Sequence, residues 1–254
     1  MISICIPSRG PVVGLWATIH ACHAQLEGVA EEEYIVVVNG KESGEPYHLL
    51  TKNSGGRVTI IDSKEPMPPP LARNYAAEKA SGEFLFFFDD HCIPARDYFP
   101  LMLLGLKQHG GVFHSSYTTH IAGPRYYHFK LNRDCPAKGD YCREAPSTAP
   151  YRCAAAPTGG FAVHRKLWEK TGGMDYFWKG FGGEEPYFDL KAWMLGYEVW
   201  MEPRALYYHF SCRAETRGYD KTFNEDNFKE AYRRLGPPEL ATLMEFFAAK
   251  DIPY

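Results

Sequence analysis

Short apolar runs, each closed by polar or turn-forming residues, recur along the first part of the chain. Their β-branched and aromatic content is typical of strands. Between them, apolar residues recur at helical spacing over residues 12–27 and 71–80. Strands that alternate with helices predict an α/β fold, with a mostly parallel central sheet flanked by helices. The expected strands are residues 2–6, 34–38, 58–62 and 84–88.

The second part of the chain continues this pattern and then loses it. Residues 121–157 are rich in proline, glycine and tyrosine and show no periodicity, which predicts a mobile loop. We expect a single domain over residues 1–254, in which residues 1–95 form the nucleotide-binding half and residues 96–254 the acceptor half. The other expected elements are helices over 98–109, 167–171, 186–195 and 224–235 and strands over 111–119, 197–201 and 206–210.

Polar residues follow three of the expected strands directly. They are Pro7-Ser8-Arg9, Asn39-Gly40 and Asp89-Asp90-His91. In mostly parallel sheets, ligands bind beyond the carboxyl ends of the strands. These three segments are therefore the first candidates for a binding site.

Composition narrows the class of protein. The net charge of −3 argues against a chain that grips polyanions by bulk charge. The apolar runs are far shorter than the roughly 18–20 residues that cross a bilayer, and the run that follows Met1 ends at Pro7 without the pattern of a signal peptide. The seven cysteines include no CxxC pair, which favours thiols in a reducing compartment. We therefore expect a cytoplasmic protein.

The segment Asp89-Asp90-His91 is the sharpest chemical feature. It places two acids and an imidazole at the end of a fully apolar strand, where unneutralised charge is costly. A divalent cation bridging to a diphosphate would neutralise it, and oxygen ligands with one imidazole suit Mn²⁺ or Mg²⁺. The alternative is an ordinary strand-end turn, in which Asp is common.

The context of this segment resembles a known family. Residues 72–90 read ARNYAAEKASGEFLFFFDD, which resembles the ARNxGxxxAxGxxLxFLDxD segment of GT-A glycosyltransferases, in particular family 2. Residues 4–9 resemble the first strand and nucleotide loop of that family, and residues 156–165 its glycine-rich acceptor-side strand. Residues 181–193 are similar to the acidic WGGEN motif of polypeptide N-acetylgalactosaminyltransferases, which also carry Asp-x-His. The resemblance implies a GT-A fold and glycosyl transfer from a nucleoside-diphosphate sugar.

The resemblance also implies roles for individual residues. Asp89, His91 and the later His209 match the metal ligands of the Asp-x-His enzymes. Asn39 stands where the family usually has an Asp that contacts the base, so the base, expected to be uracil, stays open. The residues that match donor-binding positions are Pro7, Ser8, Arg9, Asn39, Arg73, Asp89, Asp90, Gly159 and Gly160.

Glu184 and Glu185 match the catalytic acidic pair of the family. In the inverting pattern the second acid, Glu185, is the general base that takes the acceptor proton. In the retaining WGGEN enzymes the first, Glu184, binds substrate and the next residue is Asn. The second carboxylate favours inversion. Acids at this place would also stabilise the start of a helix.

The segment 121–153 is locally basic in an acidic protein. It holds six basic and three acidic residues, interleaved with aromatic residues, a pattern that suits nucleic acid or an anionic glycan. The other interpretation is a mobile acceptor loop without such a partner. The acceptor hydroxyl is therefore left open among a hydroxymethylated DNA base, a glycan and a protein.

Two other functions fit part of this pattern. A nucleotidyltransferase also uses a metal and acids at strand ends, but it should carry a glycine-rich phosphate loop with Lys or Arg, for which only Ser8-Arg9-Gly10 is available. A non-catalytic module that binds a nucleotide sugar is the second alternative, and the presence of both Glu184 and Glu185 speaks against it.

Overall fold

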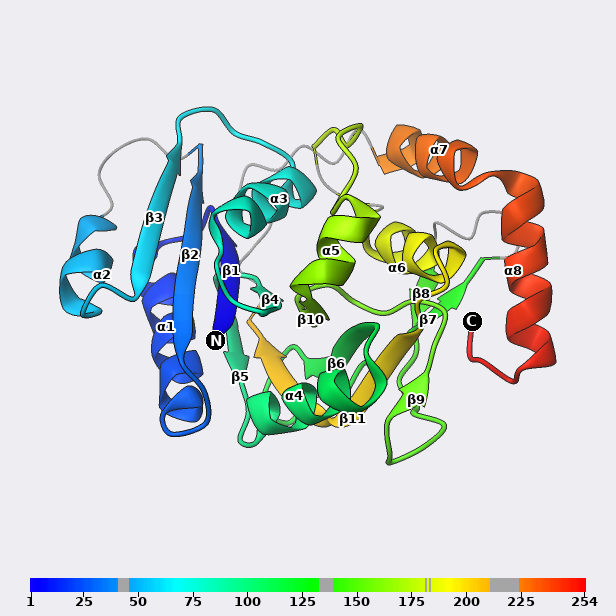
Figure 1. The fold of residues 1–254 in the computed structure, drawn as a ribbon, viewed down its shortest axis with the longest axis horizontal. Coiled ribbons are helices and arrows are strands. Elements are labelled where there is room, and N and C mark those ends of the chain that lie inside the picture. The colour runs from blue at the N-terminus through cyan, green and yellow to red at the C-terminus, as the bar shows by residue number, and fades with distance from the viewer. Residues whose placement is uncertain (41–45, 133–138, 181, 183, 211–223) are drawn as a thin grey trace.

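The computed structural model describes residues 1–40, 46–132, 139–180, 182, 184–210 and 224–254. Over these residues the chain forms eleven strands and eight helices (Figure 1). The strands are β1 (Ile2–Ser8), β2 (Glu32–Asn39), β3 (Val58–Ser63), β4 (Phe84–Phe88), β5 (Cys92–Pro94), β6 (Val112–Thr118), β7 (Phe129–Leu131), β8 (Gly139–Tyr141), β9 (Tyr151–Arg152), β10 (Gly160–His164) and β11 (Val199–His209). The helices are α1 (Val12–Leu26), α2 (His48–Asn53), α3 (Pro69–Lys79), α4 (Tyr98–His109), α5 (Arg165–Thr171), α6 (Glu184–Met194), α7 (Asn224–Leu235) and α8 (Pro237–Ala249).

The central sheet has nine strands in the order β3-β2-β1-β4-β10-β6-β11-β5, with β9 paired to β11. Strands β1 to β4 are parallel neighbours. Strand β10 runs antiparallel to both β4 and β6, so β6 points the same way as β4, and β11 is parallel to β6. The carboxyl ends of β1, β2, β4, β6 and β11 therefore share one edge of the sheet. The expected mostly parallel sheet flanked by helices is confirmed.

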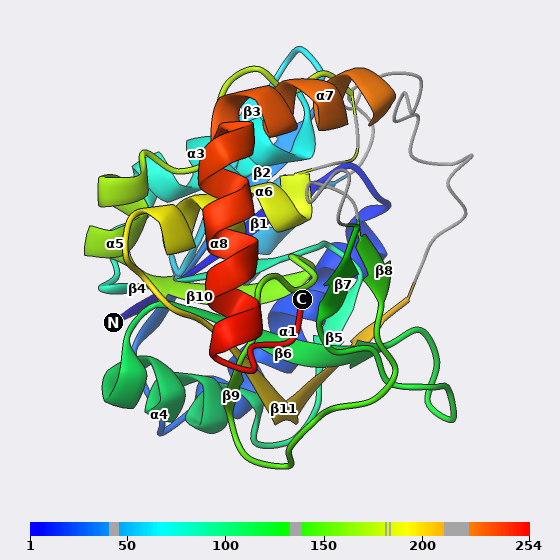
Figure 2. The same cartoon turned by 90° about the vertical axis from the view of Figure 1, so that its right-hand side faces the viewer.

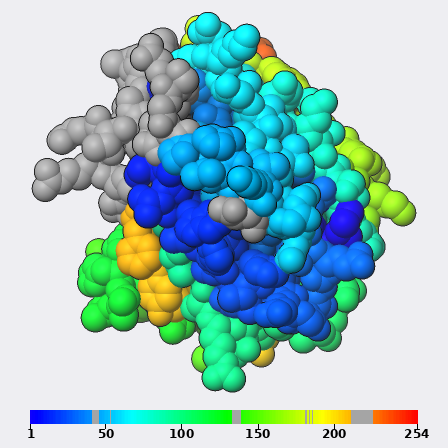
Figure 3. Space-filling view, turned by 90° about the vertical axis from the view of Figure 1, so that its left-hand side faces the viewer, coloured from blue at the N-terminus to red at the C-terminus, as the bar shows by residue number. Residues whose placement is uncertain are grey.

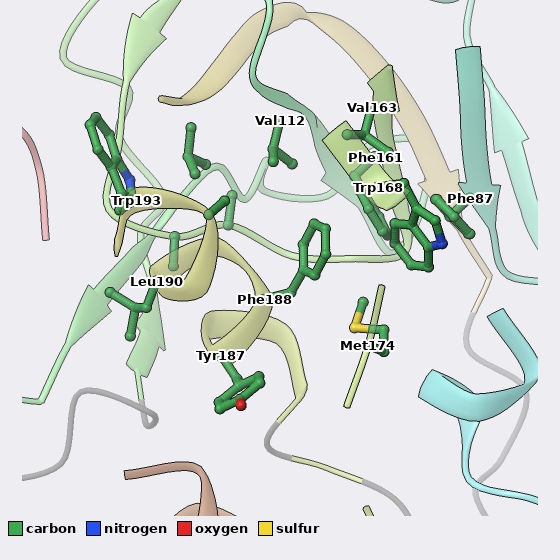
Figure 4. Packing of buried hydrophobic residues seen from close by; sticks show 14 of the residues in the cluster. Phe87, Val112, Phe161, Val163, Trp168, Met174, Tyr187, Phe188, Leu190 and Trp193 are labelled. Atoms are coloured by element: carbon green, nitrogen blue, oxygen red, sulfur yellow. The ribbon is translucent and has the colours of Figure 1, made fainter. Parts of the chain in front are cut away.

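Two apolar layers cover the faces of this sheet. On one face, α1 and α4 pack through Leu15 and Met102; on the other lie α3, α5 and α6. Figure 4 shows Phe188 of α6 beside Phe161 of β10 and Trp168 of α5, with ring centroids 5.9 and 5.2 Å from that of Phe188. Helices α7 and α8 lie outside α6, at the end of the molecule that faces the viewer in Figure 2.

The two halves of the chain meet within the sheet, where β4 pairs with β10 and β5 pairs with β11. Figure 3 shows the side formed by α1 and α2 in blue, with the gold surface of β11 at its margin. The second of these contacts is made by the short strand β5, which follows β4 and pairs antiparallel with the end of β11. This pairing places His209, the last residue of β11, near the carboxyl end of β4.

Several elements differ in detail from the expectation. The two short strands expected over 197–201 and 206–210 are one strand, β11, with an irregularity between Glu202 and Leu206. Pro203 lies there, and the Glu202 carboxylate accepts a hydrogen bond from Arg204 N at 3.0 Å. The expected loop 121–157 contains the hairpin β7–β8 and strand β9, whereas its residues 133–138 lie outside the described part. Among the helices described, none is long and apolar enough to cross a membrane.

Candidate active site

Asp90 ties the end of β4 to the end of β1. Its carboxylate accepts hydrogen bonds from Ser8 Oγ at 2.9 Å, from Arg9 N at 3.0 Å and from Gly10 N at 2.7 Å. Asp90 is only 3% exposed. A Cβ added at Gly10 would lie 2.8 Å from Asp90 Oδ2, so this contact requires glycine. Asp90 and Ser8 thus fix the two loops at the sheet edge to each other, while their predicted contact with the donor stays a prediction.

Three predicted metal ligands converge beside Asp90. His91 Nδ1 lies 2.8 Å from Asp90 Oδ1. Because a carboxylate only accepts, Nδ1 carries the hydrogen, and Nε2 is the ring nitrogen that is left to bind a cation. His91 Nε2 lies 3.0 Å from His209 Nε2, which lies 3.3 Å from Asp89 Oδ2. Residues of the turn after β4 and of the end of β11 therefore meet at one point.

These atoms have the spacing of a metal-binding site. Ligands bound at 2.0–2.1 Å in a tetrahedral shell lie roughly 3.3 Å apart, close to the separations seen between the histidines and Asp89. The side chain of Cys92 joins the group: the ligand atoms of Asp89, His91, Cys92 and His209 all lie within 4.8 Å of one another. The residues present therefore fit a divalent cation.

Arg73 connects this cluster to the acidic motif. The guanidinium is 3% exposed; its Nη2 donates to Asp89 Oδ1 at 3.2 Å and its Nη1 lies 3.8 Å from Glu184 Oε1. Burial alone would raise the pKa of Asp89, but the hydrogen bond from His209 and the positive charge of Arg73 hold it below its ordinary value. Asp89 is thus kept ionised in a position where a quarter of its side chain is exposed.

Glu184 begins α6 and is 3% exposed. Its Oε2 accepts a hydrogen bond from Gly182 N at 3.1 Å. The structure therefore brings Glu184 to the same place as the metal cluster, through Arg73. The side chain of Glu185, the other predicted catalytic acid, lies outside the described residues.

Asn39, Gly159 and Gly160 lie at the same edge with structural partners of their own. Asn39 is fully buried and exchanges two 2.8 Å hydrogen bonds with the backbone of Met67. A Cβ at Gly159 would lie 2.8 Å from the hydroxyl of Tyr207, and one at Gly160 would lie 2.6 Å from its ring, which explains why both positions lack a side chain. Whether these three residues also contact a donor stays a prediction.

Two further asparagines clamp loops near the site, and no role was predicted for either of them. Asn74 exchanges hydrogen bonds of 2.6 and 2.9 Å with the backbone of Met174. Asn227 of α7 accepts from Lys179 N and donates to the carbonyls of Lys179 and Gly182 at 2.8 and 3.0 Å. No local pattern marks Asn227, because its partners lie far away in the chain.

The predicted acceptor loop is connected to the cluster through Tyr117 of β6. The ring of Tyr117 lies 5.9 Å from that of His209 and stacks on Tyr126 at 5.0 Å. The guanidinium of Arg143 lies 5.5 Å from the Tyr126 ring. A row of aromatic rings thus runs from the metal cluster to the basic segment 121–153.

The sequence profile of the family described as Glycosyl transferase family 2 matches residues 3–170, about two thirds of the chain. The chain belongs to glycosyl transferase family 2. The matched segment includes Asp89, His91 and Arg73, whereas Glu184 and His209 lie beyond it. The family 2 assignment predicted from the residues 72–90 motif is confirmed.

One curated relative and several solved structures resemble this family 2 member at low sequence identity. The mouse protein named inactive polypeptide N-acetylgalactosaminyltransferase-like protein 5 is 26% identical over 161 residues, covering 58% of this chain and 37% of its own length. A crystal structure of GalNAc-T7 with UDP, GalNAc and Mn²⁺ matches with a TM-score of 0.75 and 17% identity, over 92% of this chain and 47% of that one.

Two other solved structures lead to the same fold. The S. aureus TarS fragment with UDP-GlcNAc matches with a TM-score of 0.67 and 14% identity, over 92% of this chain and 65% of that one. The mannosyltransferase PcManGT of Pyrobaculum calidifontis with GDP-Man and Mn²⁺ matches at 0.63 and 16%, over 98% and 75%. The family 2 member described here therefore has the GT-A fold, and it spans less than half the length of the mouse relative and of GalNAc-T7.

Proposed function

We propose that this chain is a metal-dependent glycosyltransferase that moves a sugar from a nucleoside-diphosphate donor, UDP-linked, to an acceptor hydroxyl. The observation that carries the proposal is the convergence of Asp89, His91 and His209 at metal-ligand spacing. Arg73 joins this cluster to the acidic residue Glu184. Membership of family 2 supports the reaction class.

The donor would bind across the carboxyl edge of the sheet. Asp89, His91 and His209 would hold Mn²⁺ or Mg²⁺, which when bound stabilises the negative charge that grows on a leaving diphosphate. Arg73 adds a fixed positive charge there and keeps Asp89 ionised and oriented. UDP is favoured because the structures of GalNAc-T7 and TarS were determined with UDP or UDP-GlcNAc, whereas GDP-Man in PcManGT leaves the base to experiment.

The acidic motif would act on the acceptor side. Glu184 is held by Arg73 and by Gly182 N, so it is suited to binding and orienting substrate rather than to taking up a proton. We therefore assign the general base to Glu185, which carries the proton from the acceptor hydroxyl as the glycosidic bond forms. This assignment favours inversion at the anomeric carbon.

The acceptor would approach the outer end of the aromatic row, at Tyr126 and the 44% exposed Tyr141, because Tyr117 is buried between Tyr126 and Tyr207. This row connects the metal cluster to the basic segment 121–153, where Arg125 and Lys130 are exposed. A sugar or nucleobase ring can stack on such aromatic side chains. A glycan, a protein or a hydroxymethylated DNA base each offers a hydroxyl to this route.

A non-catalytic nucleotide-sugar-binding protein is the second candidate, because the mouse relative is named inactive. It would keep the metal cluster but release no sugar. An assay of donor hydrolysis and transfer, with and without Mn²⁺, separates the two. The proposal expects slow Mn²⁺-dependent release of UDP from the donor and faster release with an acceptor. Mn²⁺-dependent UDP binding without any release would favour the non-catalytic candidate, and UDP binding that ignores Mn²⁺ would contradict both.

A further inference from the structure

Cys92 lies in the metal cluster although it matches none of the predicted ligands. The turn that follows β4 closes with a hydrogen bond from Cys92 N to Asp89 O at 3.1 Å, which brings these two residues together. Cys92 then begins β5 and stands directly opposite His209 in the antiparallel pairing with β11. Residues opposite each other in such a pair project their side chains on the same side of the sheet.

The resulting donor set is unusual for a site that serves Mn²⁺ or Mg²⁺. One carboxylate, two imidazoles and one thiol lie with their ligand atoms within 4.8 Å of one another. Hard cations prefer oxygen ligands and six positions, whereas Zn²⁺ prefers nitrogen and sulfur in a tetrahedral shell. His91 and His209 already face each other at 3.0 Å, as two ligands of a tetrahedral cation would. Cys92 is fully buried, so the thiol meets the cluster and not solvent.

We propose that Cys92 is a fourth ligand of the metal site and that it lets the chain hold a thiophilic cation such as Zn²⁺ in a closed shell that excludes the donor diphosphate. This inference rests on the metal site of the proposed function. Four protein ligands fill a tetrahedral shell, whereas a catalytic cation keeps at least one position open for substrate. Mn²⁺, with more positions and little affinity for sulfur, would leave Cys92 aside and accept the diphosphate. Zn²⁺ would therefore compete with Mn²⁺ and lower donor binding.

Cobalt substitution tests the ligand directly. The purified chain is loaded with Co²⁺, and its absorption spectrum is compared with those of Cys92→Ser and of the control Cys142→Ser, which removes a half-buried thiol that is not among the clustered residues. We expect a thiolate-to-cobalt charge-transfer band in the near ultraviolet that Cys142→Ser keeps and Cys92→Ser loses. Calorimetry should show Zn²⁺ affinity falling by roughly tenfold or more in Cys92→Ser, since even outer-shell changes cost about that much.

Each outcome decides a separate point. Co²⁺ binding without the charge-transfer band would overturn the role of Cys92 and leave the proposed function intact. Wild-type protein that binds neither Co²⁺ nor Mn²⁺ would overturn both. If Cys92→Ser does not fold, loss of the band in His209→Ala and its retention in Cys142→Ser assign the thiolate to this cluster. A band that survives in His209→Ala would place the thiolate elsewhere. UDP binding that is equally strong with Zn²⁺ and with Mn²⁺ would overturn the closed shell.

Discussion

Some side chains at the sheet edge hold the loops of the site in place, and others offer ligand atoms to a metal ion. The carboxylate oxygens of Asp90 accept hydrogen bonds from Ser8, from the backbone amides of the two residues after Ser8, and from His91. Asp89 beside it stays partly exposed and faces His209. The two adjacent acids therefore have different environments, with Asp90 orienting a ligand and Asp89 serving as one. Arg73 extends the same arrangement to Glu184.

Replacing the two acids of α6 separates their roles. Glu185→Gln keeps the size of the side chain and removes the base, so turnover should fall roughly 10²–10⁴-fold while UDP affinity stays unchanged. Glu184→Gln removes the carboxylate near Arg73, so it should weaken donor binding as well as turnover. Steady-state kinetics and calorimetry with UDP measure both. Near-normal turnover in Glu185→Gln together with an inactive Glu184→Gln would move the base to Glu184.

At the level of elements, the strands and helices that are determined by a local pattern of apolar residues were predicted from the sequence. The strands expected over 2–6 and 84–88 are β1 and β4, with β1 continuing to Ser8, and the helices expected over 12–27 and 98–109 are α1 and α4. The reversed direction of β10 could not be predicted, because its apolar residues 161–163 would be buried whichever way the strand runs. The pairing of Cys92 with His209 joins residues far apart in the chain, and periodicity carries no information on it.

Helix α7 is an element whose position could be predicted from the sequence but whose tertiary contacts could not. Its helical pattern predicted residues 224–235, and the structure places the helix there. The sequence did not indicate what the helix holds. Asn227 is 3% exposed and joins α7 to Lys179 and Gly182, directly before Glu184. We therefore expect this C-terminal helix to position the acidic motif.

Asn227→Asp tests that expectation with little change of shape. The carboxylate still accepts from Lys179 N but no longer donates to the carbonyls of Lys179 and Gly182. We expect turnover to fall roughly ten- to a hundredfold, because small misplacements of a catalytic group are costly, with UDP affinity within about twofold of wild type. Lys229→Ala, an exposed change on the same helix, is the control. Unchanged turnover in a folded Asn227→Asp, or equal losses in the control, would contradict a positioning role.

Across the whole molecule, one buried histidine links stability to pH. His128 precedes β7, is 7% exposed and contacts Tyr151 Oη at 3.0 Å through Nδ1. Burial lowers its pKa to about 4, against an ordinary value near 6.5. As pH falls from about 6.5 towards 4, the unfolded chain gains a proton that the folded chain does not, so stability is lost over that interval.

The contribution is measurable by urea unfolding at pH 7 and pH 5. For His128 the difference in unfolding free energy between the two should be roughly 2 kcal/mol. His128→Gln keeps a polar group near Tyr151 and cannot titrate, so its stability should fall by about that much less than wild type over the same interval. Equal losses in the wild type and the variant would show that folding does not lower the pKa of His128.

The distribution of charge over the molecule gives a test of the acceptor. The net charge is −3, yet segment 121–153 holds twice as many basic as acidic residues. If the acceptor is a nucleic acid, Arg125→Ala with Lys130→Ala and Arg133→Ala should weaken acceptor binding, leave donor hydrolysis unchanged and reduce the salt dependence of binding. Arg133 lies outside the described residues. If acceptor binding does not depend on salt, or is unchanged in the triple variant, the acceptor is not a nucleic acid. The remaining candidates are then a neutral sugar, a peptide or a small-molecule hydroxyl.

The most direct test of a metal-dependent donor site is calorimetric titration of UDP with Mn²⁺ and with EDTA. Wild-type protein should bind UDP with Mn²⁺ and lose most of that affinity in EDTA. Asp89→Asn removes a charged ligand next to His209 and Arg73, so it should bind UDP no better with Mn²⁺ than without. Asp62→Asn, an exposed acid in β3, should behave as wild type. UDP affinity that is the same in EDTA as in Mn²⁺, or a Mn²⁺ effect that survives in Asp89→Asn, would contradict the metal site.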